Sequence, residues 1–275
     1  MSVLTRAASA FLLILLTAGC LRLAGEECAV TSPRDGAIAV GDARRVRVVA
    51  LAGSLRIEGR TALAEVVAKG TACAATERRL EEVELLVERR GGEVVVEVRI
   101  PKRLGRGAAA ALDLEVELPD SLPLEVSDTS GPVEIRNVAS LRLDDGSGDL
   151  WIERVAGDVH VFDGSGSLEV ADVGGNVRVE DGSGDMEIRR VGRDVVIEDG
   201  SGGIVVAEVV GDVTVDEDGS GDIEVSQVGG SFMVRDDGSG SILAADVTGD
   251  FTVEHKGSGA VRHERIGGRV SVPAD

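Results

Sequence analysis

Hydrophobic and polar positions alternate in a regular way through the C-terminal half of the chain, in a repeat of 17 to 19 residues. Counted from the serine of a Gly-Ser-Gly step, positions +3, +5, +8, +12 and +14 are hydrophobic, whereas +4 and +13 are mostly polar or mixed. An alternation of period two, rich in β-branched residues, predicts two short, half-buried strands in each unit. The marker serines, the first in a degenerate step, are Ser130, Ser147, Ser165, Ser183, Ser201, Ser220, Ser239 and Ser258.

The length of the unit selects the architecture. Each half-unit has only about nine residues, too few for a closed coil of its own, so one whole unit is expected to form one coil. Stacked coils about 4.8 Å apart place equal positions above one another, and eight of them give a rod on the order of 38 Å long. An antiparallel meander of hairpins would also alternate, but it gives no reason for identical columns once per unit. The sequence therefore predicts an all-β, single-stranded β-solenoid, similar to a parallel β-helix, with rungs of 18–19 residues over 128–275.

Turn residues fit the same scheme. Glycines at the Gly-Ser-Gly steps are expected at corners with positive φ, which other residues resist. The 19-residue units gain one residue after the second strand, as in Asp216-Glu217-Asp218, and we expect this residue to lie in a turn.

An acidic column precedes the serines by two residues. Carboxylates stacked once per rung repel one another unless they are solvated, screened or bridged by cations. We expect turn aspartates that face water and accept backbone N–H bonds; the alternative is an edge that binds Ca²⁺. The repeat lacks the nonapeptide calcium pattern, so we assign no metal ligand and no cofactor. The column consists of Asp145, Asp163, Asp181, Asp199, Asp218, Asp237 and, at its end, Lys256.

The first half of the chain is less regular. Residues 42–127 are expected to form an irregular, β-rich N-terminal part of the solenoid, with early strands at 46–49 and 54–58. The segment 77–90 fits a helix or a strand, and Gly91-Gly92 followed by 94–98 favours a hairpin. A further strand is expected over 109–118, and residues 122–127 are expected to lead into the repeats.

The first twenty residues carry an export signal: one positive charge, a short apolar run and small residues. The run is too short to cross a bilayer as a helix. The ending Ala18-Gly19-Cys20 resembles the lipobox of bacterial lipoproteins, which implies cleavage after residue 19 and acylation of Cys20; an ordinary cleaved signal is the alternative. We expect a signal peptide over 1–19, a flexible tether over 20–41 and anchoring at the outer membrane, on its periplasmic face or at the cell surface.

Two cysteines remain if Cys20 is acylated. In an oxidising compartment a disulfide between Cys28 and Cys73 is expected, with two buried thiols as the alternative. The chain has no Cys-x-x-Cys step, and its three histidines show no zinc spacing.

Composition and charge narrow the class of function. One Trp, four Phe and no Tyr in 275 residues fit a narrow aliphatic interior better than the core of an ordinary enzyme. Most of the net charge of −20 belongs to the repeat half, which excludes nucleic acid as a partner.

Serial Asp-Gly-Ser-Gly-Asp-hydrophobic units, best seen at 146–150, 182–186 and 219–223, give the chain a family resemblance. With the Gly53-to-Glu58 entry and a strand ending in Leu118-Pro119, residues 42–272 resemble the DUF4097 family of bacterial β-strand-repeat proteins, which are labelled adhesins. The resemblance implies an extracytoplasmic β-solenoid and supplies no catalytic residues.

Function is accordingly expected to be interaction rather than catalysis. No serine spacing between Ser147 and Ser258 exceeds 19, which leaves no room for the long loops that build an active-site cleft. We expect an adhesin-like lipoprotein that binds an envelope protein or a glycan. We expect no small-molecule substrate. An envelope-stress sensor or scaffold is the alternative, and a polysaccharide-acting β-helix enzyme is disfavoured. Trp151, at an outward position, is expected either to stack on a sugar or to pack under a neighbouring segment.

Overall fold

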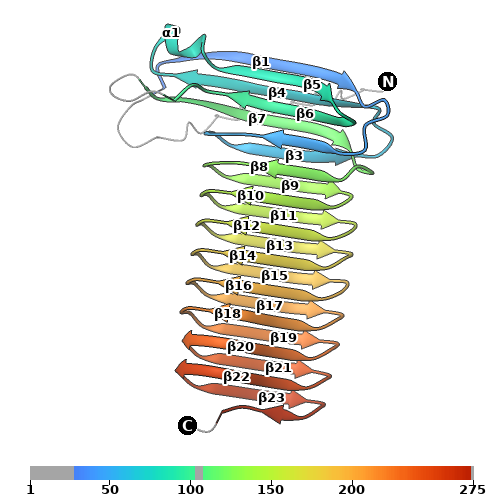
Figure 1. Ribbon diagram of the computed structural model, residues 1–275, viewed down its shortest axis with the longest axis vertical. Coiled ribbons are helices and arrows are strands. Elements are labelled where there is room, and N and C mark those ends of the chain that lie inside the picture. The colour runs from blue at the N-terminus through green and yellow to red at the C-terminus, as the bar shows by residue number, and fades with distance from the viewer. Residues whose placement is uncertain (1–27, 103–107, 274–275) are drawn as a thin grey trace, which may run out of the picture.

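Two 12-stranded sheets lie face to face along a straight rod (Figure 1). The computed structural model describes residues 28–102 and 108–273. Each repeat unit gives its first strand to one sheet, called sheet A, and its second strand to the other, called sheet B. The solenoid strands of sheet A are β9 (Val133–Val138), β11 (Leu150–Val155), β13 (Leu168–Val173), β15 (Met186–Val191), β17 (Ile204–Val209), β19 (Ile223–Val228), β21 (Ile242–Val247) and β23 (Val261–Ile266). Those of sheet B are β8 (Leu124–Ser127), β10 (Leu141–Asp145), β12 (Val159–Asp163), β14 (Val177–Asp181), β16 (Val195–Asp199), β18 (Val213–Asp218), β20 (Phe232–Ser239), β22 (Phe251–Ser258) and β24 (Val270–Ser271).

Neighbouring rungs pair in parallel and in register, which confirms the predicted β-solenoid. Leu150 pairs with Leu168 in sheet A, and Val159 pairs with Val177 in sheet B. The hydrophobic columns at +3, +5, +8, +12 and +14 fill the space between the sheets, and most of their members are fully buried. Removing a Val or Ile side chain from water is worth roughly 1.5–3 kcal/mol, so each rung is held by the same few aliphatic contacts repeated along the rod.

A left-handed residue bends the end of each sheet A strand. Positions +5 and +8 both point inward although they are three residues apart, which plain alternation forbids. The residue at +7 resolves this conflict with a φ between 52° and 60°, and the ladder skips it: Glu153 pairs with Ala171 and Val155 with Val173. These left-handed positions are Asn137, Arg154, Asp172, Arg190, Glu208, Gln227, Asp246 and Arg265.

The second glycine of each Gly-Ser-Gly step occupies the expected corner. Gly166 has a φ of +142°, and a Cβ at this position would lie 1.9 Å from the carbonyl oxygen of Gly148 in the preceding rung. Only glycine fits there, because both the backbone conformation and the close rung contact exclude a side chain.

The extra residue of the 19-residue units does not lie in a turn, so that expectation is wrong. Val215 pairs with Ile197 and Glu217 with Glu198, which leaves Asp216 as a bulge inside β18. A bulge absorbs one residue without changing which side chains face the core on either side of it. The cost of the insertion is therefore confined to one strand position.

The N-terminal part continues both sheets but changes their pairing. In sheet A, β1 and β4 are antiparallel, as are β4 and β7, and β7 then runs parallel to β3, which joins β9. In sheet B, β2 pairs with β8 and β6, and β5 and β6 form the expected hairpin. The elements are β1 (Val30–Ala39), β2 (Val46–Val49), β3 (Leu55–Arg60), β4 (Glu65–Ala74), α1 (Glu77–Leu80), β5 (Glu84–Arg90), β6 (Glu93–Arg99) and β7 (Ala110–Pro119).

The predicted tether over 20–41 is wrong for its second half, because Val30–Ala39 forms β1. This strand pairs with β4 over ten residues and lies at the edge of sheet A. Pro33 and Gly36 made the segment look unlike a strand in the sequence, because both residues are unfavourable inside a sheet. An edge strand tolerates both. The structure joins Cys28 to Cys73, the pairing expected from the sequence, with Cα atoms 5.6 Å apart and a 45-residue separation. The N-terminal part thus covers one end of the solenoid, whose strand edges would otherwise be open.

Candidate functional site

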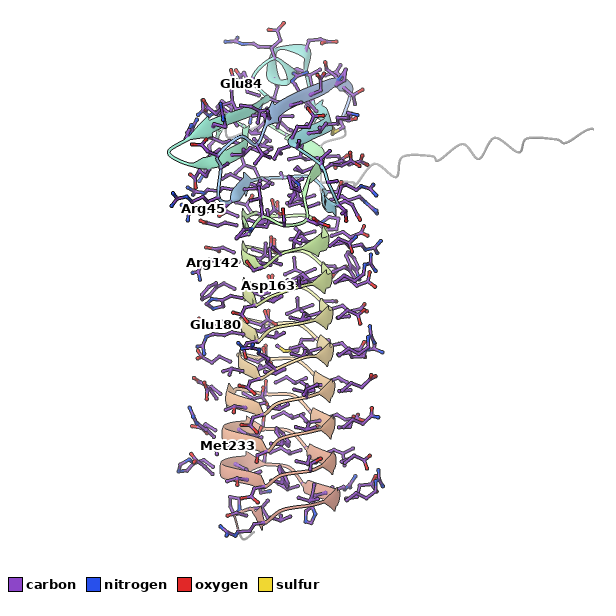
Figure 2. The ribbon with its side chains drawn as sticks, turned by 90° about the vertical axis from the view of Figure 1, so that its right-hand side faces the viewer. Arg45, Glu84, Arg142, Asp163, Glu180 and Met233 are labelled. Carbon is purple, nitrogen blue, oxygen red and sulfur yellow. A yellow bond between two sulfur atoms is a disulfide. The ribbon has the colours of Figure 1, made fainter. Side chains whose placement is uncertain are left out.

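The aspartates two residues before the serines point into the solenoid rather than into water, which corrects the sequence-based expectation. Their side chains lie between the two sheets, as Figure 2 shows for Asp163, and the residues are only 1–7% exposed. Strand β12 explains the direction, because Val159, Val161 and Asp163 follow one another at period two and share the inner face. We call the set the aspartate ladder: Asp128, Asp145, Asp163, Asp181, Asp199, Asp218 and Asp237.

The ladder has few hydrogen-bond donors. The backbone N–H of Ser165 donates to Asp163 and that of Ser183 to Asp181, both at 3.2 Å. Both carboxylate oxygens of Asp145 and Asp218 are buried without a donor from the described residues. Two carboxylates on adjacent rungs can bond each other only when a proton lies between them. If neighbouring ladder aspartates bond each other, part of the ladder must be protonated.

The pKa values of the ladder agree with this requirement. Burial, then the charges of neighbouring aspartates, raises the pKa of Asp181 from 3.8 to about 7. Burial likewise raises the pKa of Asp199 to about 6 and that of Asp145 above its usual range. At the C-terminal end Lys256 pairs with Asp237 in register, and its charge partly offsets the burial that raises the pKa of Asp237. The interior thus retains protons near neutral pH.

Within residues 28–102 and 108–273, no group of three or more Asp, Glu, His or Cys side chains is arranged to hold a metal ion. The same ranges contain no helix that is long and apolar enough to cross a membrane.

The outer face of sheet A carries a row of side chains that crosses the strands. Register places Trp151 between Glu134 and Glu169, and the row continues toward the N-terminal part through Arg56. Trp151 is 41% exposed, so of the two expectations for this residue the structure contradicts packing under a neighbouring segment.

Two hollows meet at Trp151. One measures about 460 Å³ and lies toward the N-terminal part; the other measures about 440 Å³ and lies toward the C-terminal end. Charged side chains of both signs line the first, whereas those that line the second are all acidic. We call the two hollows and the tryptophan the Trp151 face. The charged and aromatic residues that line it are Arg56, Lys69, Asp113, Glu115, Glu134, Trp151, Glu169, Asp185 and Glu187.

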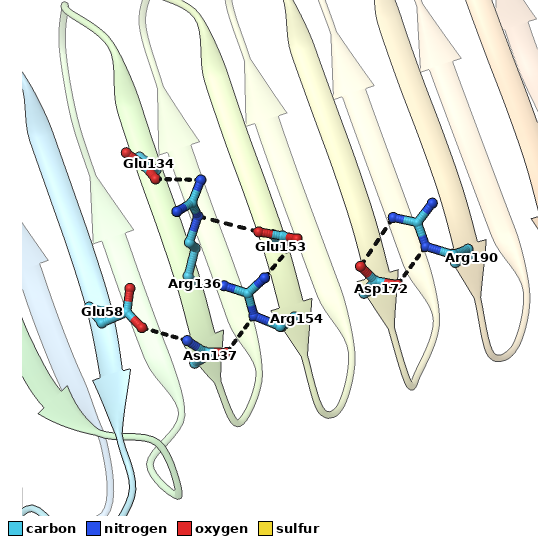
Figure 3. A network of polar contacts seen from close by, with 8 residues as sticks. All are labelled: Glu58, Glu134, Arg136, Asn137, Glu153, Arg154, Asp172 and Arg190. Atoms are coloured by element: carbon cyan, nitrogen blue, oxygen red, sulfur yellow. Dashed lines mark hydrogen bonds and ion pairs between the residues drawn. The ribbon is translucent and has the colours of Figure 1, made fainter.

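The corner formed by the left-handed residues is occupied by its own ion pairs (Figure 3). Arg190 donates to both oxygens of Asp172 on the preceding rung, at 2.6 and 3.1 Å, and Arg154 donates to Asn137 at 2.7 Å. These contacts tie successive rungs together. Arg190, Glu208, Gln227 and Asp246 of the same corner also line an open hollow of about 990 Å³.

Among the cysteines predicted to be modified, Cys20 lies outside the described residues. Cys28 lies just before β1, and Cys73 lies in β4, two residues after Thr71, which lines the first hollow. Sequence reasoning identified Trp151 as a candidate but missed the two hollows. It also missed the inward direction of the aspartates, although the period-two count from Val159 and Val161 contained that signal.

The fold and the two sheets define a β-solenoid protein. No family model and no curated protein matches the chain. Among solved structures, the chain is similar to a "putative adhesin" from Bacteroides fragilis NCTC 9343, with 14% identity, 89% of this chain and 98% of that chain covered, and a TM-score of 0.42. It is also similar to a "putative lipid binding protein" from Parabacteroides distasonis ATCC 8503, with 15% identity, coverage of 88% and 97%, and a TM-score of 0.41. A "putative cell adhesion protein" from Clostridium sporogenes ATCC 15579 has 14% identity, coverage of 89% and 100%, and a TM-score of 0.34. None of the three is described as an enzyme, and likeness at this level carries no functional argument.

Proposed function

We propose that the chain is a non-enzymatic, adhesin-like interaction module that binds an envelope protein or glycan through the outer face of sheet A. The observation that carries this proposal is the exposed Trp151 between two hollows, on a face built from rigid, in-register rungs. An exposed aromatic side chain in a hollowed surface is typical of a binding site. Repetition of the rungs gives the partner an extended surface.

Catalysis is disfavoured by where the carboxylates lie. The ladder aspartates are enclosed between the sheets, and the outward acids form rows imposed by the repeat. A general acid or base must reach its substrate, which a group sealed in the core does not do.

We further propose that the protein is exported, acylated at Cys20 and held at the outer membrane. The lipobox-like ending at residues 18–20 supports this location, as does a cysteine pair suited to an oxidising compartment. The serial Gly-Ser-Gly-Asp phrases support membership of the DUF4097 family. Palmitate labelling of the full chain and of Cys20→Ser, followed by membrane fractionation, tests the anchor: label and membrane retention should both depend on Cys20.

A binding assay with two faces of the same rod tests the interaction. Full-length Cys20→Ser protein is titrated onto isolated cell envelopes, alone and with Trp151→Ala or Phe162→Ala. Phe162 is a matched control, since it lies on β12 of sheet B. We expect saturable binding that Trp151→Ala weakens at least fivefold and Phe162→Ala leaves unchanged. A lack of saturable binding, or an equal loss of binding in both variants, would contradict the proposal.

The aspartate ladder favours one second candidate, a sensor of envelope stress. A core whose carboxyls titrate near neutral pH couples the stability of the rod to the acidity of its surroundings. The pH experiment in the Discussion tests this coupling directly.

A further inference from the structure

We propose that the Trp151 face binds an uncharged glycan chain, with Trp151 as the stacking platform between two sugar subsites. The inference rests on the proposed function and names the chemical class of the partner. It is carried by the position of the tryptophan, the volumes of the hollows and the charges of their walls.

The tryptophan has the geometry of a platform. Side chains on a strand stand roughly perpendicular to the sheet, so the indole rises from β11 between the two hollows that it lines. Its neighbours in the row, Glu134 and Glu169, are polar, so the indole is an apolar surface bordered by hydrogen-bonding groups. The C–H face of a pyranose ring matches the first property, and its hydroxyls match the second.

The first hollow offers donors and acceptors together. Arg56 and Lys69 supply N–H groups, and Asp113 and Glu134 supply oxygens. Arg56 forms an ion pair with Glu134, and Asp113 accepts hydrogen bonds at 2.9 Å from both the N–H and the hydroxyl of Ser54. Groups held in this way are positioned before a ligand arrives, which reduces the cost of ordering them. Sugar hydroxyls both donate and accept, so they can use both kinds of partner.

The second hollow excludes anionic sugars. Its charged lining consists of Glu169, Asp185 and Glu187, without a Lys or Arg. In a chain with a net charge of −20, a uronic acid or sulfated sugar would be repelled there. The carboxylates accept hydrogen bonds from uncharged hydroxyls without that penalty.

The extent of the site points to a chain rather than to a single sugar. The two hollows span the strands from β4 to β17, which are neighbours in the order β4-β7-β3-β9-β11-β13-β15-β17. Seven strand spacings of about 4.8 Å give a length on the order of 34 Å. Each hollow has a volume in the range of small-ligand sites. A glycan that lies across the strands would fill both hollows and pass over Trp151.

Trp151 is the single tryptophan of the chain, so its fluorescence reports on this site alone. Full-length Cys20→Ser protein is titrated with a neutral hexamer of N-acetylglucosamine, with cellohexaose and with polygalacturonate as the anionic comparison. We expect at least one neutral hexasaccharide to change the indole emission saturably and polygalacturonate to bind at least tenfold more weakly. Preferential binding of polygalacturonate, or no saturable binding of either neutral hexamer at millimolar concentration, overturns the inference.

Variants separate the platform from the hollow. By calorimetry, Trp151→Ala should weaken binding of the neutral hexamer at least tenfold, Trp151→Phe less than fivefold, and the sheet B control Phe162→Ala not at all. Gly203→Gln fills the second hollow and keeps the fluorescent reporter. Gly203 has no positive φ, and the nearest atom to an added Cβ is Oδ1 of Asp185 at 3.3 Å. This is a close contact, but the exposed Asp185 side chain can relieve it by a small shift, so the fold should tolerate the change. Undiminished binding by both Trp151→Ala and Gly203→Gln contradicts the site.

The outcomes also distinguish this inference from the proposed function. Saturable, Trp151-dependent binding to envelopes without binding to either neutral hexamer refutes the glycan and retains the interaction module, with a protein as its partner. Loss of both kinds of binding refutes both.

Discussion

The regular solenoid and the N-terminal strands both bury one face of each strand, but they do so with different pairing. In the solenoid each rung repeats the one before it, so Leu150 lies on Leu168 and a glycine lies against the glycine of the preceding rung. In the N-terminal part β1, β4 and β7 run antiparallel, and the pair Cys28–Cys73 joins its edge. Repetition stabilises the solenoid through identical contacts in each rung. It also means that a restriction on a side chain or on the backbone at one position applies at the same position of every rung. The N-terminal part avoids those constraints and depends on a few particular contacts.

The largest difference in stability between the two regions should appear when a glycine is replaced by alanine. Gly166→Ala places a Cβ against the Gly148 carbonyl at a φ that alanine resists, and we expect a loss of at least about 4 kcal/mol in unfolding free energy. Gly91→Ala, in the β5–β6 turn, meets nothing within 4 Å and should cost about 1 kcal/mol. Urea denaturation of both variants measures the gap; equal losses would show that rung contact is not what selects glycine.

Removal of the disulfide should lower the stability of the N-terminal part more than that of the solenoid. The bond closes a loop with a sequence separation of 45, and its loss, in Cys28→Ser with Cys73→Ser, should cost about 3 kcal/mol. Hydrogen exchange should locate the loss in β1 and β4 and leave the amides of the solenoid protected. Uniform loss of protection along the rod would show instead that the two regions unfold as one unit.

The interior of the solenoid should respond to pH. In the unfolded chain Asp181 titrates near its ordinary pKa of 3.8, whereas in the folded chain its pKa is about 7. Between these values the native state holds more protons, so stability is greatest at low pH and falls as pH rises through the folded pKa. We expect Asp181 alone to contribute a loss of about 1–3 kcal/mol between pH 5 and 8.

An asparagine in the ladder tests this explanation. Asp181→Asn should raise the thermal midpoint at pH 8 and change it little at pH 5, because the amide stays neutral and donates to a neighbouring carboxyl. Asp144→Asn, at an exposed position of β10, is the control and should leave the pH profile of the midpoint unchanged. A profile that Asp181→Asn does not flatten would exclude the ladder as its source.

The smallest effect should come from left-handed residues, which occur in both regions. Glu208 in the solenoid has a φ of 60° and Ala62 in the N-terminal part a φ of 61°. Glycine relieves this conformation, so Glu208→Gly and Ala62→Gly should each stabilise by about 0.5–1 kcal/mol. Glu187→Gly, without positive φ, should destabilise by about as much. Chemical denaturation of the three variants checks the signs.

Much of the solenoid was predictable because its periods are independent of context. Alternation at period two placed Leu150 and Ile152 on one face, and the unit length placed Leu168 and Val170 above them. The hairpin of β5 and β6 followed from Gly91-Gly92 between two hydrophobic runs. The direction of the aspartates was not predicted, because a buried carboxylate is costly; that cost falls when neighbours retain protons, which requires the stacked rungs.

The sequence by itself determined the rung, its hydrophobic columns and the glycines at its corners, because each follows from the local chain and from a period repeated eight times. Only the tertiary structure decided what lies between rungs and beside them. It turned the extra residue at Asp216 into a bulge, since in-register pairing of Asp218 with Asp199 required it. It recruited Val30–Ala39 as a strand because the edge of β4 was available. It made Trp151 the meeting point of two hollows, since residues from eight strands, distant in the sequence, line that face.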